Sequence, residues 1–155
     1  MKTIVVSGSR SRVGKTQLAE RLLRLLKSWS ALKVTVSKDD SCPHERNCGI
    51  CSDVREPFYI IKDEAIINEY GKDTARLKNA GAKQVIWLKA KSEGLEEGLS
   101  KALSEFSECN GVVIEGTSVL KFIKPDLSIL VKDKSSALKP SAEEVIKKVD
   151  LILTV

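Results

Sequence analysis

The sequence predicts an α/β protein with a doubly wound, mainly parallel sheet and helices on both of its faces. Two observations support this fold class. Short apolar runs, of a length that suits buried strands, alternate with amphipathic segments along the chain. A glycine-containing loop also separates the first apolar run from the first amphipathic segment. The length of 155 residues is that of one domain, so residues 1–155 are expected to share one core.

The first three segments should be a strand, a helix and a second strand. Residues 2–7 contain an uninterrupted apolar run and are expected to form a buried strand. Residues 17–27 should form a helix, because apolar side chains recur there at helical spacing. Residues 33–37 alternate between polar and apolar side chains and should form the second strand. The side chains expected to face the sheet from the helix and its end are Leu18, Leu22, Leu25, Leu26 and Trp29.

A long polar loop is expected over residues 39–56. A loop of this length is uncommon in a compact domain and usually has a function. The apolar run at residues 57–61 should be a short strand. Asp63 then follows and can cap a helix that runs to about residue 70.

Residues 71–74 should end that helix, because they contain a glycine and three polar side chains. A further helix is expected over residues 74–80. Asp73 or Thr74 can cap its start, and Gly81 can close its end.

The last third of the chain repeats the alternation of strands and helices. A helix is predicted over residues 95–109, and another runs from a cap at Ser141 to residue 148, with acidic residues in its first turn. The inward side chains of the first of these helices should be Leu95, Leu99, Ala102, Leu103 and Phe106. The expected strands are residues 84–89, 111–115, 127–131 and 151–155.

The loop after the first strand has the features of a phosphate-binding P-loop, as in P-loop NTPases. It ends in Gly14-Lys15-Thr16, and a helix follows. Backbone N–H groups of such a loop and of the helix N-terminus favour anionic oxygens. Lys15 would bind the β- and γ-phosphates of GTP or ATP, and Thr16 would hold Mg²⁺. The residues expected to contact the nucleotide are Gly8, Ser9, Arg10, Ser11, Arg12, Val13, Gly14, Lys15, Thr16 and Gln17.

The spacing of this loop differs by one residue from the usual pattern. In the usual pattern four residues separate the first glycine from the Gly-Lys pair, which would place that glycine at Ser9, but the chain has its glycine at Gly8. A chance Gly-Lys-Thr in a basic chain is the alternative. The strand before the loop and the helix after it favour the P-loop.

Glu115 is the second candidate site residue. It ends an apolar strand, and Gly116 follows it. A carboxylate at this place, beside the first strand, can hold Mg²⁺ through water or polarise the attacking group. We therefore predict Lys15 and Glu115 as catalytic residues, and Thr16 and Glu115 as residues of a Mg²⁺ site. The alternative is a charged strand end that meets solvent.

The third candidate is a group of cysteines in the long polar loop. Cys48 and Cys51 form a C-x-x-C pair, and Cys42 and His44, the only histidine, lie a few residues earlier. Such ligands can hold Zn²⁺ or an iron–sulfur cluster. Cys109 is a possible further ligand, although it can equally be a buried apolar thiol. Free thiols and a redox pair are the alternatives to a metal site.

Charge and hydropathy exclude some function classes. The net charge of +5 is compatible with nucleic acid, but aromatic residues are few and form no cluster with basic ones, so nucleic-acid binding is not expected. The longest apolar runs are too short for a membrane span or a signal peptide. We therefore expect a cytoplasmic protein without a membrane partner.

Three separated segments together resemble the MobB family, the molybdopterin-guanine dinucleotide biosynthesis proteins of type B. The first is the loop that ends in Gly14-Lys15-Thr16. The second runs from Gly71-Lys72-Asp73-Thr74-Ala75-Arg76 to Ala80-Gly81-Ala82 and is similar to that family's Gly-Lys-Asp-Ser and Ala-Gly-Ala segment. The third is Glu115-Gly116 after an apolar strand. The spacing of the loop itself is also similar to that of dethiobiotin synthetase.

The resemblance implies a homodimer that binds GTP, hydrolyses it slowly with Mg²⁺, and acts as an accessory protein in molybdenum cofactor biosynthesis. Its protein partner would be the transferase that attaches the nucleotide to molybdopterin. Arg10 stands where related dimeric P-loop ATPases carry a signature lysine, so Arg10 or Arg12 could reach the phosphates across a dimer.

The sequence also departs from the family. The cysteine loop replaces a histidine-containing stretch, and no Asn-Lys-x-Asp motif for guanine is present, which leaves residues 131–134 as the candidate base contact. Two further functions therefore stay open. One is a metal-binding adapter whose conformation the nucleotide controls. The other is a small-molecule kinase or synthetase similar to dethiobiotin synthetase.

Overall fold

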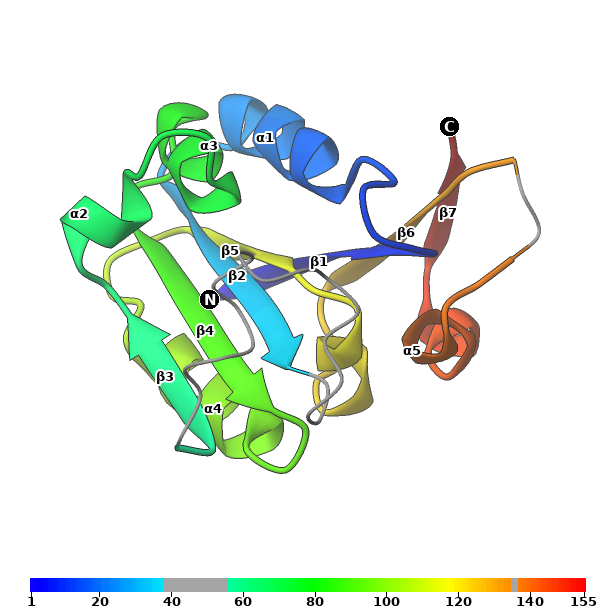
Figure 1. Ribbon diagram of the computed structural model, residues 1–155. Helices are drawn as coiled ribbons and strands as arrows, with labels where there is room; N and C mark the ends of the chain where they lie inside the picture. Colours follow the sequence, from blue (N-terminus) through cyan, green and yellow to red (C-terminus); the bar gives the residue numbers. More distant parts are fainter. Residues whose placement is uncertain (38–55, 135–136) are drawn as a thin grey trace.

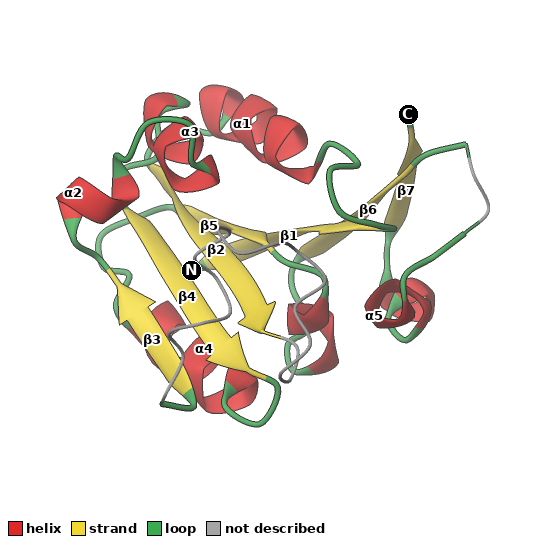
Figure 2. Cartoon of the chain, in the orientation of Figure 1, coloured by secondary structure: helices red, strands yellow, loops and turns green. Residues whose placement is uncertain are grey.

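The computed structural model describes residues 1–37, 56–134 and 137–155, and these form a seven-stranded sheet (Figures 1 and 2). The strand order is β3-β4-β2-β5-β1-β6-β7. Neighbouring strands are parallel except for β3, which pairs antiparallel with β4 at one edge of the described sheet. The strands are β1 (Lys2–Gly8), β2 (Trp29–Ser37), β3 (Phe58–Ile61), β4 (Val85–Lys91), β5 (Gly111–Glu115), β6 (Leu127–Lys132) and β7 (Leu151–Thr154).

Helices cover both faces of this sheet, as Figure 2 shows for α1 and α3 above it and α4 below it. The predicted α/β class, with a mainly parallel sheet, is therefore confirmed. The helices are α1 (Lys15–Leu25), α2 (Glu64–Ile67), α3 (Asp73–Asn79), α4 (Leu95–Ser104) and α5 (Pro140–Glu143), with 3-10 turns η1 (Ser118–Lys121) and η2 (Ile146–Lys148).

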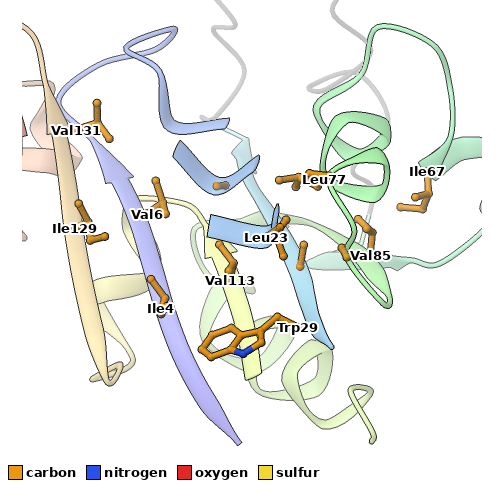
Figure 3. Close-up of a cluster of buried hydrophobic side chains, with 14 of the residues drawn as sticks. Ile4, Val6, Leu23, Trp29, Ile67, Leu77, Val85, Val113, Ile129 and Val131 are labelled. Carbon is orange, nitrogen blue, oxygen red and sulfur yellow. The ribbon is translucent and has the colours of Figure 1, made fainter. Parts of the chain in front are cut away.

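Two apolar clusters, one on each face, hold the layers together. The first lies under α1 and α3 and includes Leu23, Leu77 and Val113 (Figure 3). The second packs α4 and η1 on the other face and includes Leu99 and Ile114. Alternate residues of the central strand β5 thus serve opposite clusters, as the two-residue period of a strand requires.

Helix α1 presents a different side to the sheet from the predicted one. Its buried residues are Thr16, Ala19 and Leu23, whereas Leu25 is 78% exposed. Leu18, Leu22 and Leu26 pack at the margin of the same cluster and are partly buried. The predicted inward face was therefore wrong for Leu25. The helix begins at Lys15 rather than at residue 17, and the apolar side chains at both margins hid the direction of the inward stripe.

Strand β2 begins at Trp29, four residues before the predicted start, so Trp29 belongs to the sheet and not to the helix end. Ser28, with φ 60°, reverses the chain between α1 and β2. The longer strand adds Ser30 to the sheet. Its polar side chain interrupts the apolar pattern, which explains why the sequence indicated a shorter strand.

The helix starts were predicted correctly at Asp63 but not at α3 or α5. The Asp63 side chain accepts a hydrogen bond of 2.8 Å from the Ala65 N–H and caps α2, which is shorter than expected. Neither Asp73 nor Thr74 caps α3, because Lys72 occupies the N-cap position. The Asp73 carboxylate instead forms an ion pair with Lys33 of β2.

The last predicted helix is broken into α5 and η2, and Ser141 does not cap it. Pro140 takes the first helical position after the N-cap Lys139, a place for which its fixed φ is suited. Helix α4 also ends earlier than predicted, at Ser104, although Phe106 remains buried. The loop predicted over residues 39–56 lies almost wholly outside the described residues.

Among the described residues, no helix combines the length and the apolar character that a membrane crossing would need.

The orientation of α1 can be tested with two substitutions of the same type. We expect Leu23→Ala to lower the free energy of unfolding by about 2–5 kcal/mol, because it removes a buried side chain and leaves a cavity. Leu25→Ala should change it by less than about 0.5 kcal/mol, because that side chain faces solvent. Urea denaturation measures both values, and equal losses would contradict the observed orientation.

Candidate functional site

The candidate site lies where β1, β5 and β2 end side by side. In the register of the sheet, Glu115 at the end of β5 is the neighbour of Val6 on β1 and of Lys33 on β2. Ligand sites of open parallel sheets lie at this carboxyl edge. The strand order therefore brings Glu115 next to the loop that follows β1.

The loop between β1 and α1 folds its lysine back over its first glycine. A Cβ atom at Gly8 would lie 2.8 Å from Cγ and Cδ of Lys15 and 2.8 Å from Cγ1 of Val13. A side chain at position 8 would therefore force Lys15 and Val13 to move. Gly14 has φ +105°, which is strained for other residues, and Arg12 also has a positive φ of 58°. The usual spacing would place this glycine one residue later. The close approach of the Lys15 side chain explains why it stands at position 8 instead.

The N-terminus of α1 has no capping side chain. Gly14 is the N-cap and supplies no side-chain acceptor, and no acidic residue lies in the first turn. An eleven-residue helix carries partial positive charge at this end. Nζ of Lys15 donates to the Arg10 carbonyl over 3.2 Å and makes no ion pair with any described carboxylate. The first turn and Lys15 together therefore offer an anion site.

Hydrogen bonds from three other segments fix the start of this loop. The Gly8 N–H donates to Thr117 Oγ1 over 3.1 Å, and the Ser9 N–H donates to the Val131 carbonyl over 2.9 Å. The Ser9 carbonyl accepts a bond of 2.8 Å from the Lys139 N–H. Arg10 also forms an ion pair with Asp133. The loop is therefore tied to β5 and β6 and to the start of α5.

A group of four side chains lies behind the loop, on the face of the sheet that α1 and α3 cover. Thr16 Oγ1 is 3.0 Å from both carboxylate oxygens of Glu115 and donates to them. Nζ of Lys33 lies 2.8 Å from Oε1 of Glu115 and 2.7 Å from Oδ2 of Asp73. Glu115 is 2% exposed, so it does not meet solvent as an ordinary strand end would.

The pKa values of this group reflect the balance between burial and neighbouring charge. Burial opposes ionisation of Lys33, but Glu115 and Asp73 outweigh it and raise the pKa of the Lys33 ammonium above its ordinary value. Burial likewise acts to raise the pKa of Asp73, yet Lys33 outweighs it and holds that pKa below its ordinary value. Both groups are therefore charged at neutral pH.

The pKa of Lys15 is shifted in the opposite direction from that of Lys33. Burial lowers the pKa of its ammonium; Glu115 acts against this, and the charge of Lys33 lowers the pKa further. The positive charge of Lys15 is thus less fully balanced by neighbouring carboxylates than that of Lys33. An anion bound at the start of α1 would supply the missing charge.

Helix α3 is held in place against α1, which positions Asp73. Nη2 of Arg76 lies 2.6 Å from Oε2 of Glu20, and Nε of Arg76 donates to the other carboxylate oxygen over 3.3 Å. Such a two-point pair fixes the relative orientation of its partners. Arg76 also lies 3.6 Å from Oδ1 of Asp73.

A hollow adjoins the loop on its outer side, between α1 and the strands β6 and β7. Its walls are mainly apolar, with an amide and a guanidinium among them. It is lined by Val13, Gly14, Gln17, Leu18, Arg21, Val131, Leu153 and Val155.

Most of the predicted site residues come together. Residues 8–17 form the loop and the start of α1, and Glu115 contacts Thr16. The sequence reasoning missed Lys33 and Thr117, and it assigned Asp73 only a capping role. The one available signal was a charged residue, Lys33, in a strand whose other polar residues are all uncharged.

The cysteine site cannot be placed in the same way. Cys42, His44, Cys48 and Cys51 all lie outside the described residues. Cys109 is described, is partly buried, and packs at the margin of the second apolar cluster. It precedes β5 and so lies at the amino edge of the sheet, opposite the candidate site.

The depressed pKa of Asp73 predicts a pH-dependent contribution to stability. A carboxylate of this kind stabilises the fold above its ordinary pKa of 3.8, and the contribution is lost as the pH falls through its lower folded-state value. The stability difference between the wild type and Asp73→Asn should therefore be largest near neutral pH and shrink below pH 3.8. Urea denaturation of both proteins over this range measures it, and a constant difference would contradict the Lys33–Asp73 pair.

Comparisons with protein-family models, with curated proteins and with solved structures found no match to this chain.

Proposed function

We propose that this protein is a P-loop protein that binds a nucleoside triphosphate, GTP or ATP, together with Mg²⁺ and hydrolyses it slowly. The observation that carries the proposal is the uncapped start of α1 with Lys15 folded over Gly8. Orphan N–H groups and a lysine at one helix start form an arrangement that suits phosphate oxygens. The proposal includes residues 8–17 as the phosphate-binding segment.

Lys15 and the backbone of the first turn would share the work on the phosphates. The Lys15 ammonium, now bonded to the Arg10 carbonyl, would move its hydrogen bond to a phosphate oxygen. Charge-assisted hydrogen bonds of this kind are about twice as strong as neutral ones. Because the charge on the γ-phosphate oxygens changes during hydrolysis, Lys15 would also stabilise the transition state.

The residues behind the loop fit Mg²⁺. Thr16 donates its hydroxyl proton to Glu115, which leaves the oxygen lone pairs available to a cation. The donor set is a hydroxyl with the carboxylates of Glu115 and Asp73, and such oxygen ligands suit Mg²⁺. Among the described residues, no three His, Cys, Asp or Glu side chains gather into a metal site, so phosphate oxygens would have to complete the coordination.

Bound Mg²⁺ would withdraw charge from the phosphate oxygens. Glu115 would hold the Thr16 hydroxyl in place for the metal. Its burial keeps bulk water away from these contacts.

The hollow between α1 and β7 would accept the base and ribose. It adjoins Gly14 and Gln17, so a nucleotide whose phosphates lie at the helix start has its other end within reach. The apolar walls suit the faces of a base, and Gln17 and Arg21 offer polar contacts to its edge or to the ribose.

The resemblance to the MobB family supports an extension of this proposal to molybdenum cofactor biosynthesis. In that role a homodimer of the protein would assist the transferase that attaches a nucleotide to molybdopterin. The segment Gly71-Lys72-Asp73-Thr74 is the most specific part of the resemblance, and its Asp73 contacts the candidate site through Lys33. Stimulation of that transferase by the purified protein with GTP is the corresponding assay.

The phosphate site is tested by the loss of Lys15. Lys15→Ala should weaken binding of GTP and of ATP by more than about tenfold, because hydrogen bonds to charged groups contribute about 1.5–3 kcal/mol each. Lys27→Ala, which removes the same charge from an exposed position after α1, should leave binding unchanged. Calorimetry with and without Mg²⁺ measures both, and unaltered affinity in Lys15→Ala would overturn the proposal.

The base site is tested by two neighbouring residues of β7. Leu153→Glu should weaken binding of the nucleoside triphosphate by about tenfold, or roughly 1.4 kcal/mol, because it places a charge in the hollow. Inorganic triphosphate should be far less affected. Ile152→Glu is the control, since successive side chains of a strand point to opposite faces and Ile152 does not line the hollow. Equal effects on the two ligands would place the base elsewhere.

A further inference from the structure

Lys33 is an unusual residue for its place in the fold. It lies on β2, between β4 and β5 in the middle of the sheet, and its side chain is only 16% exposed. Its neighbours Leu32 and Val34 point to the opposite face and belong to the second apolar cluster. A lysine rarely occupies such a position unless it is paired.

The partners of Lys33 are the two carboxylates nearest to Thr16. Nζ lies 2.7 Å from Asp73 and 2.8 Å from Glu115, and the oxygen of Glu115 that it contacts is also 3.0 Å from Thr16 Oγ1. The ammonium therefore holds the same oxygens that a divalent cation would need. Asp73 and Glu115 come from different elements, α3 and β5, and Lys33 contacts both of them.

We propose that Lys33 is an internal counter-ion that excludes divalent metal from Asp73 and Glu115 until the phosphates of a nucleotide arrive. Its contacts with both carboxylates carry the inference. Mg²⁺ then enters only as its complex with nucleotide. This order of binding rests on the function proposed above, whereas the exclusion of free metal does not.

Charge explains why free metal is excluded from the protein without nucleotide, whereas Mg²⁺ can bind once the phosphates are present. In the free protein a metal ion would have to displace an ammonium that already neutralises two carboxylates, in a place where little water can compensate. The phosphates bring their own negative charge and their own metal ligands. They shift the balance toward Mg²⁺ without requiring Lys33 to leave both of its partners.

Other positive charges near Asp73 and Glu115 would also oppose the binding of a free divalent cation. Arg76 approaches Asp73 from α3, at 3.6 Å, and the Lys15 ammonium interacts with Glu115 from the loop. Free metal would therefore meet several cations around two carboxylates.

Mn²⁺ binding to the full-length protein without nucleotide tests the exclusion, with electron paramagnetic resonance as the readout. Mn²⁺ prefers oxygen ligands to thiolates, so the cysteines contribute little. We expect no bound Mn²⁺ in the wild type. Lys33→Met should bind Mn²⁺ at least about tenfold more tightly than the wild type, because an opposing charge close to the carboxylates is removed.

Two control variants separate this role from a purely structural one. Lys33→Arg keeps the charge and should still exclude Mn²⁺. The double variant Lys33→Met, Asp73→Asn should lose the Mn²⁺ gained by Lys33→Met, which shows that the metal lies at this pair and not elsewhere in the chain. Lys33→Gln, which removes the charge but keeps an N–H donor for the carboxylates, replaces Lys33→Met if the latter does not fold.

The outcomes are distinct. A gain of Mn²⁺ binding in Lys33→Met or Lys33→Gln, reversed by Asp73→Asn, supports the inference. Stoichiometric Mn²⁺ binding by the wild type that Asp73→Asn abolishes would overturn it, as would a folded Lys33→Met protein that gains none. If the wild type binds no nucleotide, the proposed function fails, but the Mn²⁺ result for Lys33 still stands.

Discussion

The contact between Lys33 and Glu115 sets the geometry of the site. A carboxylate that is 2% exposed at the end of a central strand needs a partner, because loss of one member of a buried ion pair typically costs about 3–5 kcal/mol. Parallel pairing of β2 with β5 places the two residues side by side. The Thr16 hydroxyl then binds the same carboxylate, so the first turn of α1 is anchored to the sheet through a polar contact.

The contact between Thr16 and Glu115 explains both the orientation of α1 and the glycine at position 8. Once Thr16 faces Glu115, Ala19 and Leu23 follow on the same side of α1, and Leu25 is turned toward solvent. Lys15, one residue earlier, points back over the loop and would have to move for a side chain at position 8. The identity of Gly8 and the orientation of the helix thus have the same cause.

Local patterns were enough to predict the strands but not the contacts at their ends. The apolar run Val112-Val113-Ile114 and the Gly14-Lys15-Thr16 turn are local features, and they led to a correctly placed strand and to a helix whose predicted start was two residues late. Lys33, Asp73 and Glu115 are far apart in the chain and meet only because of the strand order. The predicted cap at Ser141 was wrong because Pro140 already takes the first helical position after Lys139.

The distribution of charge favours an anion as the first ligand of this site. On the inner side, two carboxylates and Lys33 are paired through short contacts, and the Thr16 proton is also satisfied. On the outer side, the start of α1 has no capping side chain, and Lys15 bonds only a carbonyl among the described residues. The carboxylates of Asp73 and Glu115 are therefore already paired with a cation of the protein itself. The partial positive charge of the α1 start and the full charge of Lys15 both lie at the loop, an arrangement that suits an anion better than a free cation.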